Sequence, residues 1–151
     1  MFAIRNASLD DGIPILAIQK RAFETEARVC GQWEIAPLLE TLDSVLDHIQ
    51  TATVLAAIKD DRIIGSIRGV LAESACMVGA LSIEPELQGH GIGSALLHAI
   101  EAAHPQATRF HLLTNRKIKS NVRFYLRHGY TITDTIQHSD KITLVNMGKQ
   151  R

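Results

Sequence analysis

The sequence has few cysteines, few aromatic residues and no surplus of charge of either sign. Its 151 residues include two cysteines, Cys30 and Cys76, which form no CxxC motif and indicate no disulfide framework. Sixteen basic residues balance sixteen acidic ones. Bulk electrostatics therefore gives no reason to expect nucleic acid or an anionic membrane as the main partner.

Long apolar runs are also absent. No stretch approaches the roughly 20 apolar residues that a helix needs to cross a bilayer, and residues 1–6 lack the apolar centre of a signal peptide. A hydrophobic content of 46% and a charged content of 21% are ordinary for a globular protein. We therefore expect a single domain over residues 1–151, located in the cytoplasm.

Seven histidines raise the question of a metal site. They stand at positions 48, 90, 98, 104, 111, 128 and 138, with no HExxH motif and no paired Cys/His spacing. We therefore expect no bound metal.

The hydrophobic pattern alternates between strand and helix signals. Apolar and β-branched runs predict strands at residues 2–6, 53–59, 62–71, 75–83, 108–114, 130–136 and 141–147. Apolar residues at helical spacing predict helices at residues 13–27, 37–49, 92–103 and 118–126. A sequence typical of a capping box, Ser8 to Asp11, precedes the first helix, and Pro37 opens the second.

This order of elements predicts an α+β fold with three layers. Short turns between strands 53–59, 62–71 and 75–83 favour antiparallel pairing, and the segment 75–114 should contain one right-handed parallel crossover. We expect a mixed, mostly antiparallel twisted sheet of six or seven strands, flanked by about four helices on its two faces. The C-terminal strand is expected at an exposed edge, where it could pair with a second copy in a homodimer.

The most informative stretch connects the expected strand 75–83 with the expected helix 92–103. Residues 81–94 read LSIEPELQGHGIGS, with glycines at 89, 91 and 93. Glycine lets the backbone bend sharply and lets a ligand approach closely. A helix N-terminus adds unpaired N–H groups and a partial positive charge. Together these features predict a binding site for an anion, most naturally a phosphate.

Three kinds of nucleotide-binding turn compete for this stretch. A P-loop requires GxxxxGK[ST], and no lysine stands at the required place. A nicotinamide-dinucleotide turn requires GxGxxG, but counting from Gly89 the third glycine is replaced by Ser94, and the next strand ends in Thr114-Asn115 without an acid. The third kind, the Q/R-x-x-G-x-G/A turn that holds the pyrophosphate of CoA, matches residues 88–93 in full.

On these residues the chain resembles the GNAT superfamily of acetyl-CoA-dependent N-acetyltransferases. The resemblance extends over essentially the whole element order and is most specific over residues 80–130. It implies that the strand pairs with pantetheine and that the turn cradles the pyrophosphate of acetyl-CoA. The cofactor-binding residues that it implies are Leu81, Ser82, Ile83, Gln88, Gly89, His90, Gly91, Ile92, Gly93 and Ser94. His90 stands where the family often has Lys or Arg, and a neutral imidazole offers one donor and less charge.

A second motif, Asn121 to Tyr125 followed by Gly129-Tyr130, also resembles this family. Asn121 and Tyr125 are four residues apart on the expected helix, so they share a face. The resemblance implies that Asn121 binds the cofactor and that Tyr125 faces its sulfur, while Tyr130 is expected to pack. A phenol with a pKa near 10 can return a proton to a leaving thiolate with a pKa of about 8.5. Taken alone, Tyr125 fits a half-buried aromatic under the sheet better than a catalytic residue, but its spacing to Asn121 and its place after the glycine-rich turn favour the functional role.

Two further parts of the chemistry are expected. By resemblance, a bulge near Leu81–Ile83 would aim a backbone N–H at the thioester oxygen. An alkyl ammonium with a pKa near 10.4 must also lose a proton, and Glu73, Glu84 and His111 are candidate bases. Glu84 follows the central strand and is the catalytic candidate. Each residue also has a structural alternative: Glu84 as a solvated acid before a proline, Glu73 as part of an exposed turn, and His111 as a core histidine.

In this family the first two helices and their loop usually shape the acceptor pocket. Here they carry Glu24, Glu26, Trp33, Glu34 and Glu40. Acids around an aromatic ring suit a cationic amine, so Trp33, Glu34 and Glu24 are candidate substrate residues. The acceptor is then expected to be a small-molecule or peptide amine. In the alternative interpretation, these acids form a solvated surface and Trp33 only packs.

The leading interpretation is a single acetyltransferase domain that moves an acetyl group from acetyl-CoA to a primary amine. We expect direct transfer in a ternary complex, because nothing in the sequence pairs Cys76 with a histidine. The alternative is a CoA- or acyl-CoA-binding sensor without turnover. Tyr125 argues against the sensor, because binding alone needs no acid at the sulfur.

Overall fold

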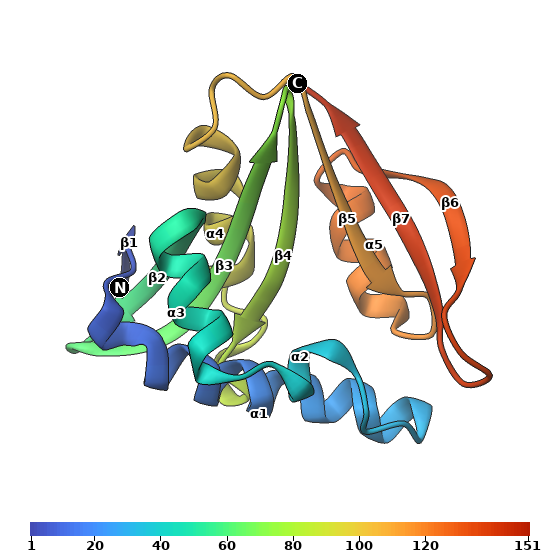
Figure 1. The fold of residues 1–151 in the computed structure, drawn as a ribbon, viewed down its shortest axis with the longest axis horizontal. Coiled ribbons are helices and arrows are strands. Elements are labelled where there is room, and N and C mark those ends of the chain that lie inside the picture. Colours follow the sequence, from blue (N-terminus) through green and yellow to red (C-terminus); the bar gives the residue numbers. More distant parts are fainter.

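A seven-stranded sheet forms the centre of the computed structural model, which describes residues 1–151 (Figure 1). Its strands are β1 (Ala3–Asn6), β2 (Thr53–Lys59), β3 (Arg62–Ala72), β4 (Ala75–Ile83), β5 (Arg109–Asn115), β6 (Thr131–Gln137) and β7 (Thr143–Gln150). Their order in the sheet is β1-β2-β3-β4-β5-β7-β6, and only β4 and β5 pair in parallel. The predicted mixed, mostly antiparallel sheet is confirmed.

Helices cover both faces of this sheet. They are α1 (Gly12–Cys30), α2 (Ala36–Leu39), α3 (Leu42–Thr51), α4 (Ile92–Ala102) and α5 (Lys119–Arg127), with short 3-10 turns η1 (Leu9–Asp11) and η2 (Pro85–Leu87). Successive side chains of a strand point to opposite faces. On β2, Val54 and Ala56 pack with α1 and α3, whereas Leu55 and Ala57 join the core under α4. This alternation produces the predicted three layers. None of the helices has the length and apolar character of a membrane span.

The start of α1 follows from local side-chain chemistry. The carboxylate of Asp11 accepts a hydrogen bond from the backbone N–H of Ser8 at 2.7 Å, which forms the predicted capping box. Arg5 on β1 donates to the same carboxylate at 2.6 Å and ties the strand to the helix start. The helix ends at Gly31, whose φ of 64° gives a left-handed C-cap.

The predicted single helix over residues 37–49 is wrong, because the structure divides it into α2 and α3. Glu40 is extended, with φ −61° and ψ 137°, and Thr41 caps α3 by accepting a hydrogen bond from the Ser44 N–H at 3.2 Å. The Glu40 carboxylate is held by Arg68 of β3 at 2.9 Å. This long-range ion pair fixes the break, and hydrophobic periodicity carries no sign of it.

The expectation that the C-terminal strand is an exposed edge is also wrong. β7 lies between β5 and β6 and pairs with both, so the sheet edges are β1 and β6. The hairpin of β6 and β7 turns the chain back and buries Val145 and Met147 in the main core. Pairing of the last strand with a second copy is therefore blocked by β6.

The strands β4 and β5 separate after a short parallel contact. They pair only where residues 75–77 meet residues 109–111, and the space between them widens beyond this point (Figure 1). A register shift between Ser66 and Arg68 places two residues of β4, Ala80 and Leu81, opposite the single residue Ile67 of β3, so β4 has one extra residue. Ala80 has a φ of 51°. The expected bulge is therefore present, beginning one residue earlier than predicted. It bends β4 away from β5 and opens the sheet.

Candidate functional site

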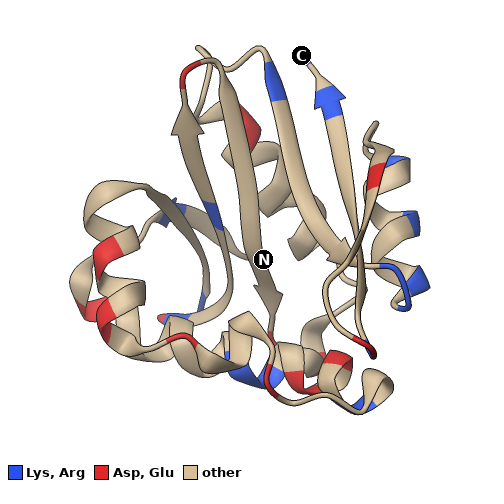
Figure 2. Ribbon diagram, turned by 45° about the vertical axis from the view of Figure 1, so that its right-hand side comes forward, with Lys and Arg blue, Asp and Glu red and all other residues tan.

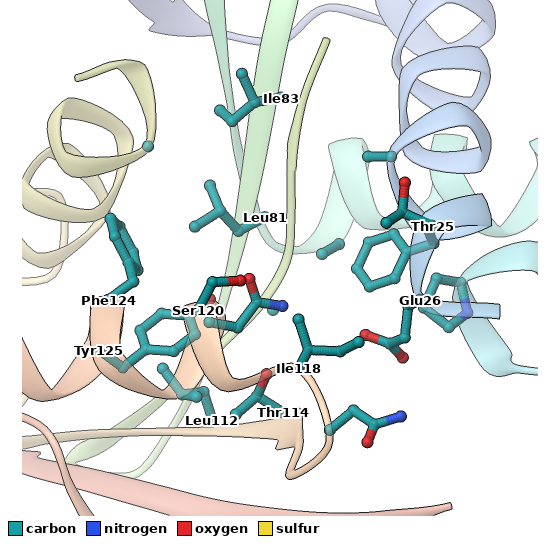
Figure 3. Close-up of a pocket in the computed structure, with 18 of the residues that line it drawn as sticks. Thr25, Glu26, Leu81, Ile83, Leu112, Thr114, Ile118, Ser120, Phe124 and Tyr125 are labelled. Carbon is teal, nitrogen blue, oxygen red and sulfur yellow. The ribbon is translucent and has the colours of Figure 1, made fainter. Parts of the chain in front are cut away.

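A cavity of about 820 Å³ occupies the opening between β4 and β5 (Figure 3). One wall consists of the end of β4, the glycine-rich turn before α4 and the first two turns of α5. The other wall consists of the C-terminal half of α1, the start of α2 and parts of β5 and β7. The cavity therefore brings together the two sequence motifs, which are about 30 residues apart in the chain.

The glycine-rich turn has a run of backbone donors without acceptors. The N–H groups of residues 89–94 donate to no acceptor in the protein, and the first helical bond of α4 runs from Ala95 N to Gly91 O at 3.1 Å. Gly89 and Gly91 have φ values of 82° and 84°, a region that costs other residues about 1–2 kcal/mol. Six consecutive unpaired amides at a helix N-terminus form a ready-made anion site.

Eight of the ten residues predicted on the strand and turn line the cavity: Leu81, Ile83, Gln88, Gly89, Gly91, Ile92, Gly93 and Ser94. The exceptions are Ser82 and His90. The buried Ser82 hydroxyl donates to the carbonyl of Ala80 at 3.2 Å. Nδ1 of His90 lies 3.0 Å from the carbonyl oxygen of Gln88, so it is the protonated nitrogen and donates there. A neutral His90 therefore has no second donor for a phosphate.

Both predicted residues of α5 line the same cavity. Asn121 lies in the first turn, and Tyr125 follows one turn later with 9% of its surface exposed. Burial raises the pKa of the Tyr125 phenol above its usual value, and the negative charge of Glu26 raises it further. The Tyr125 ring packs edge-on against Phe124, with ring centroids 5.1 Å apart. No group of the protein hydrogen-bonds the Tyr125 hydroxyl, so its proton is free for a ligand.

Tyr130 has the packing role predicted for it. Its ring is fully buried, and its hydroxyl donates to the Glu101 carboxylate at 2.7 Å. Lys149 donates to the same carboxylate at 3.0 Å. The Tyr130 hydroxyl is therefore committed to this ion pair, in contrast to that of Tyr125.

The three candidate bases lie outside the cavity lining. Glu84 accepts two hydrogen bonds from Arg21, at 2.8 and 2.9 Å, and this pairing lowers the pKa of its carboxyl. His111 lies in a separate groove formed by β5, β6 and β7, and burial lowers its pKa. Glu73 occupies the turn between β3 and β4 with a φ of 57°.

The acceptor residues predicted from the sequence are also placed outside the cavity. Glu24, Trp33 and Glu34 are exposed, and Glu40 is paired with Arg68. Glu26 is instead the one carboxylate in the lining. The sequence offers a weak signal for it, because Glu26 lies one helical turn after Phe23 on the apolar stripe of α1.

Charge is distributed unevenly around the cavity. α5 carries basic residues and no acidic ones (Figure 2). Three of its nine residues are basic: Lys119, Arg123 and Arg127. A helix of this charge beside the unpaired amides favours an anionic ligand at this end of the cavity.

Comparison with known proteins gives a consistent result. Residues 31–151, more than half of the chain, match the profile of the family described as "Acetyltransferase (GNAT) domain". No curated protein has a significantly similar sequence.

Solved structures share the fold over the whole chain. The PaiA N-acetyltransferase from Thermoplasma acidophilum, in complex with coenzyme A, aligns with a TM-score of 0.85 and 18% identity over 100% of this chain and 99% of its own. YncA from Salmonella typhimurium, with acetyl-CoA, aligns with a TM-score of 0.77 and 17% identity over 99% of this chain and 94% of its own. Ribosomal-protein-alanine N-acetyltransferase from Brucella melitensis aligns with a TM-score of 0.79 and 17% identity over 99% of both chains.

Proposed function

The chain belongs to the GNAT acetyltransferase family, and from this premise we propose that it transfers the acetyl group of acetyl-CoA directly to a primary amine. Transfer takes place in a ternary complex of protein, acetyl-CoA and amine. The observation that carries this proposal is the run of unpaired amides over residues 89–94, which opens onto the cavity that Tyr125 lines.

The turn suits the pyrophosphate of acetyl-CoA. Its amides have no competing acceptor, and two glycines provide the left-handed backbone that directs them. Gln88 and Ser94 add side-chain donors at the two ends of the turn, and Asn121 adds one from α5. His90 contributes to the shape of the turn through its bond to the Gln88 carbonyl.

The bulged end of β4 suits the pantetheine arm. Because β4 leaves β5 after residue 77, its edge beyond this point has no strand partner on that side. Leu81 and Ile83 line the cavity there. Backbone groups at the bulge can then pair with the amides of pantetheine, and one N–H can polarise the thioester carbonyl.

Tyr125 is the proposed acid for the leaving sulfur. Its hydroxyl has no partner within the protein and lies in the cavity between α5 and α1 (Figure 3). Burial keeps the phenol protonated by raising its pKa. Tyr125 therefore holds a proton that it can donate as the carbon–sulfur bond breaks.

An acyl-enzyme on cysteine is disfavoured. Cys76 is fully buried and lies outside the cavity lining, and burial raises the pKa of its thiol to about 11. The thiolate is the nucleophilic form, so Cys76 offers almost none of it at neutral pH. Direct attack by the amine follows.

A thiol-release assay with acetyl-CoA and a panel of amines tests this function. Tyr125→Phe should keep the affinity for CoA and lose about 10²-fold in kcat. Tyr130→Phe is the control, because it removes the other phenol of the chain and should change stability rather than kcat. CoA binding without turnover of any amine would favour the sensor without catalysis.

A further inference from the structure

Glu26 is the one acidic side chain that faces the cavity, and it has no cationic partner. It takes part in none of the six ion pairs of the protein. Its carboxyl group points from α1 toward Ile118 and Tyr125 on the opposite wall (Figure 3). The Glu26 charge is close enough to Tyr125 to raise the pKa of the phenol. A free carboxylate and the proposed acid therefore share one chamber.

The part of the cavity around Glu26 combines polar groups of Thr25, Thr114 and Asn115 with a larger set of apolar side chains. The apolar side chains come from α1, from the start of α2 and the residue before it, from the residue before α5, and from the start of β7 and the residue before it: Phe23, Ile35, Pro37, Ile118, Ile142 and Leu144. Burial raises the pKa of the Glu26 carboxyl, and a side-chain interaction with Asn115 acts in the opposite direction. A buried carboxylate without a cationic partner is costly, and an ammonium group that enters the cavity lowers this cost.

Given the proposed acetyl transfer, on which this inference rests, we propose that Glu26 binds the ammonium group of a monocationic primary amine with an apolar body and removes its proton. One carboxylate matches one ammonium. A second positive charge on the acceptor would find no second carboxylate in the cavity lining. The exposed acids Glu24 and Glu34 lie outside the cavity and do not supply one.

The proton transfers balance with these two side chains. Glu26 takes one proton from R–NH3⁺ and leaves R–NH2, whose lone pair forms the bond to the acetyl carbon. Tyr125 gives its proton to the sulfur as the carbon–sulfur bond breaks, and it regains a proton from the acetylated nitrogen. Glu26 returns its proton to water. The sum is R–NH3⁺ plus acetyl-CoA giving R–NH–COCH3, CoA–SH and H⁺.

The pH dependence of kcat/KM for hexylamine identifies the base. The kcat/KM of the wild type should be constant from a pH just above the pKa of Glu26 to a pH of about 10.4, the pKa of an alkylamine. Glu26→Gln must bind the neutral amine, so its kcat/KM should rise about tenfold per pH unit from pH 6 to 9. The deficit at pH 7 should be about 10²-fold or more. Asp47→Asn, an exposed acid on α3 outside the cavity, is the control and should follow the wild type.

Other ionisable groups face the same chamber and must be separated from Glu26. They are Tyr125 and Arg127 on α5 and His138 on the connection between β6 and β7. If His138→Gln rather than Glu26→Gln removed the plateau, the assignment would be overturned. A loss of turnover in Glu84→Gln or Glu24→Gln equal to that of Glu26→Gln would also overturn it.

Two acceptors of equal length test the charge requirement. Hexylamine should have a kcat/KM at least about tenfold above that of 1,6-diaminohexane, because the diamine brings a second positive charge for which the cavity lining has no second carboxylate. Comparable values for the two amines would contradict the proposed acceptor class.

Binding provides a readout without turnover. Calorimetric titration of hexylamine into the protein saturated with CoA should give binding that Glu26→Gln weakens at least about tenfold at pH 7, and unchanged binding would refute the role of Glu26. If no amine caused thiol release from acetyl-CoA but binding still depended on Glu26, the proposed acetyl transfer would be refuted. The proposed amine site at Glu26 would then be supported by the binding data.

Discussion

Replacing Gly91 with alanine tests whether the ligand, rather than the protein, holds the glycine-rich turn. Gly91 has a φ of 84°, and an added Cβ would meet no atom within 4 Å, so backbone strain is the only direct cost. A left-handed conformation costs an alanine about 1–2 kcal/mol. Because no protein acceptor fixes the amides of residues 89–94, the free chain can relax this strain. CoA binding must restore the left-handed backbone and take up the cost.

The expected result is a Kd for CoA about 5- to 30-fold weaker, with little change in Tm. Isothermal titration calorimetry with CoA and a thermal melt of the free protein measure the two quantities. Gly31→Ala is the matched control, since Gly31 has a φ of 64° and open space around it at the end of α1. It should lower Tm and leave the Kd unchanged. A Kd for Gly91→Ala within twofold of wild type, together with a lower Tm, would refute the reasoning.

Two further predictions concern stability and the route of transfer. The pKa of Glu40 is lowered from 4.5 to about 2 in the folded protein by Arg68, Gln19 and Ser44, so its stabilisation is fully present well above pH 4.5 and is lost as the pH falls through this range toward 2. Denaturant titrations should show that Glu40→Gln is less stable at pH 7 and that its stability depends less on acid pH, and equal pH slopes for the two proteins would refute the pairing. Cys76→Ala should keep at least half of the wild-type kcat, because direct acetyl transfer does not use the thiol. A burst of labelled acetyl bound to the wild-type protein and absent from Cys76→Ala would contradict direct transfer.

Local signals made much of the fold predictable. The strands that border the cavity and the turn that follows β4 were evident because glycines, prolines and apolar runs act within a few residues. The break between α2 and α3 was missed, because Glu40 is held by Arg68, 28 residues later. The place of β7 between β5 and β6 was missed for a similar reason, because strand order depends on long-range pairing.

The same limit applies to the candidate site. The unpaired amides before α4 follow from the glycine spacing and were expected. Glu24 and Glu26 are two residues apart in the sequence, and only the rotation of α1, set by buried Ile15 and Ile18, decides that Glu26 faces the cavity. The pairing of Glu84 with Arg21 joins the end of β4 to α1, and no local pattern announces it.

The most direct test of the account follows the backbone amides of residues 89–94 during a titration with CoA. In ¹H–¹⁵N spectra of the labelled protein, the amide signals of Gly89, Gly91 and Gly93 should move with a common Kd and exchange more slowly with water when CoA is bound. CoA binding that leaves these signals unchanged, or shifts only residues away from the turn, would contradict the claim that the unpaired amides hold the pyrophosphate.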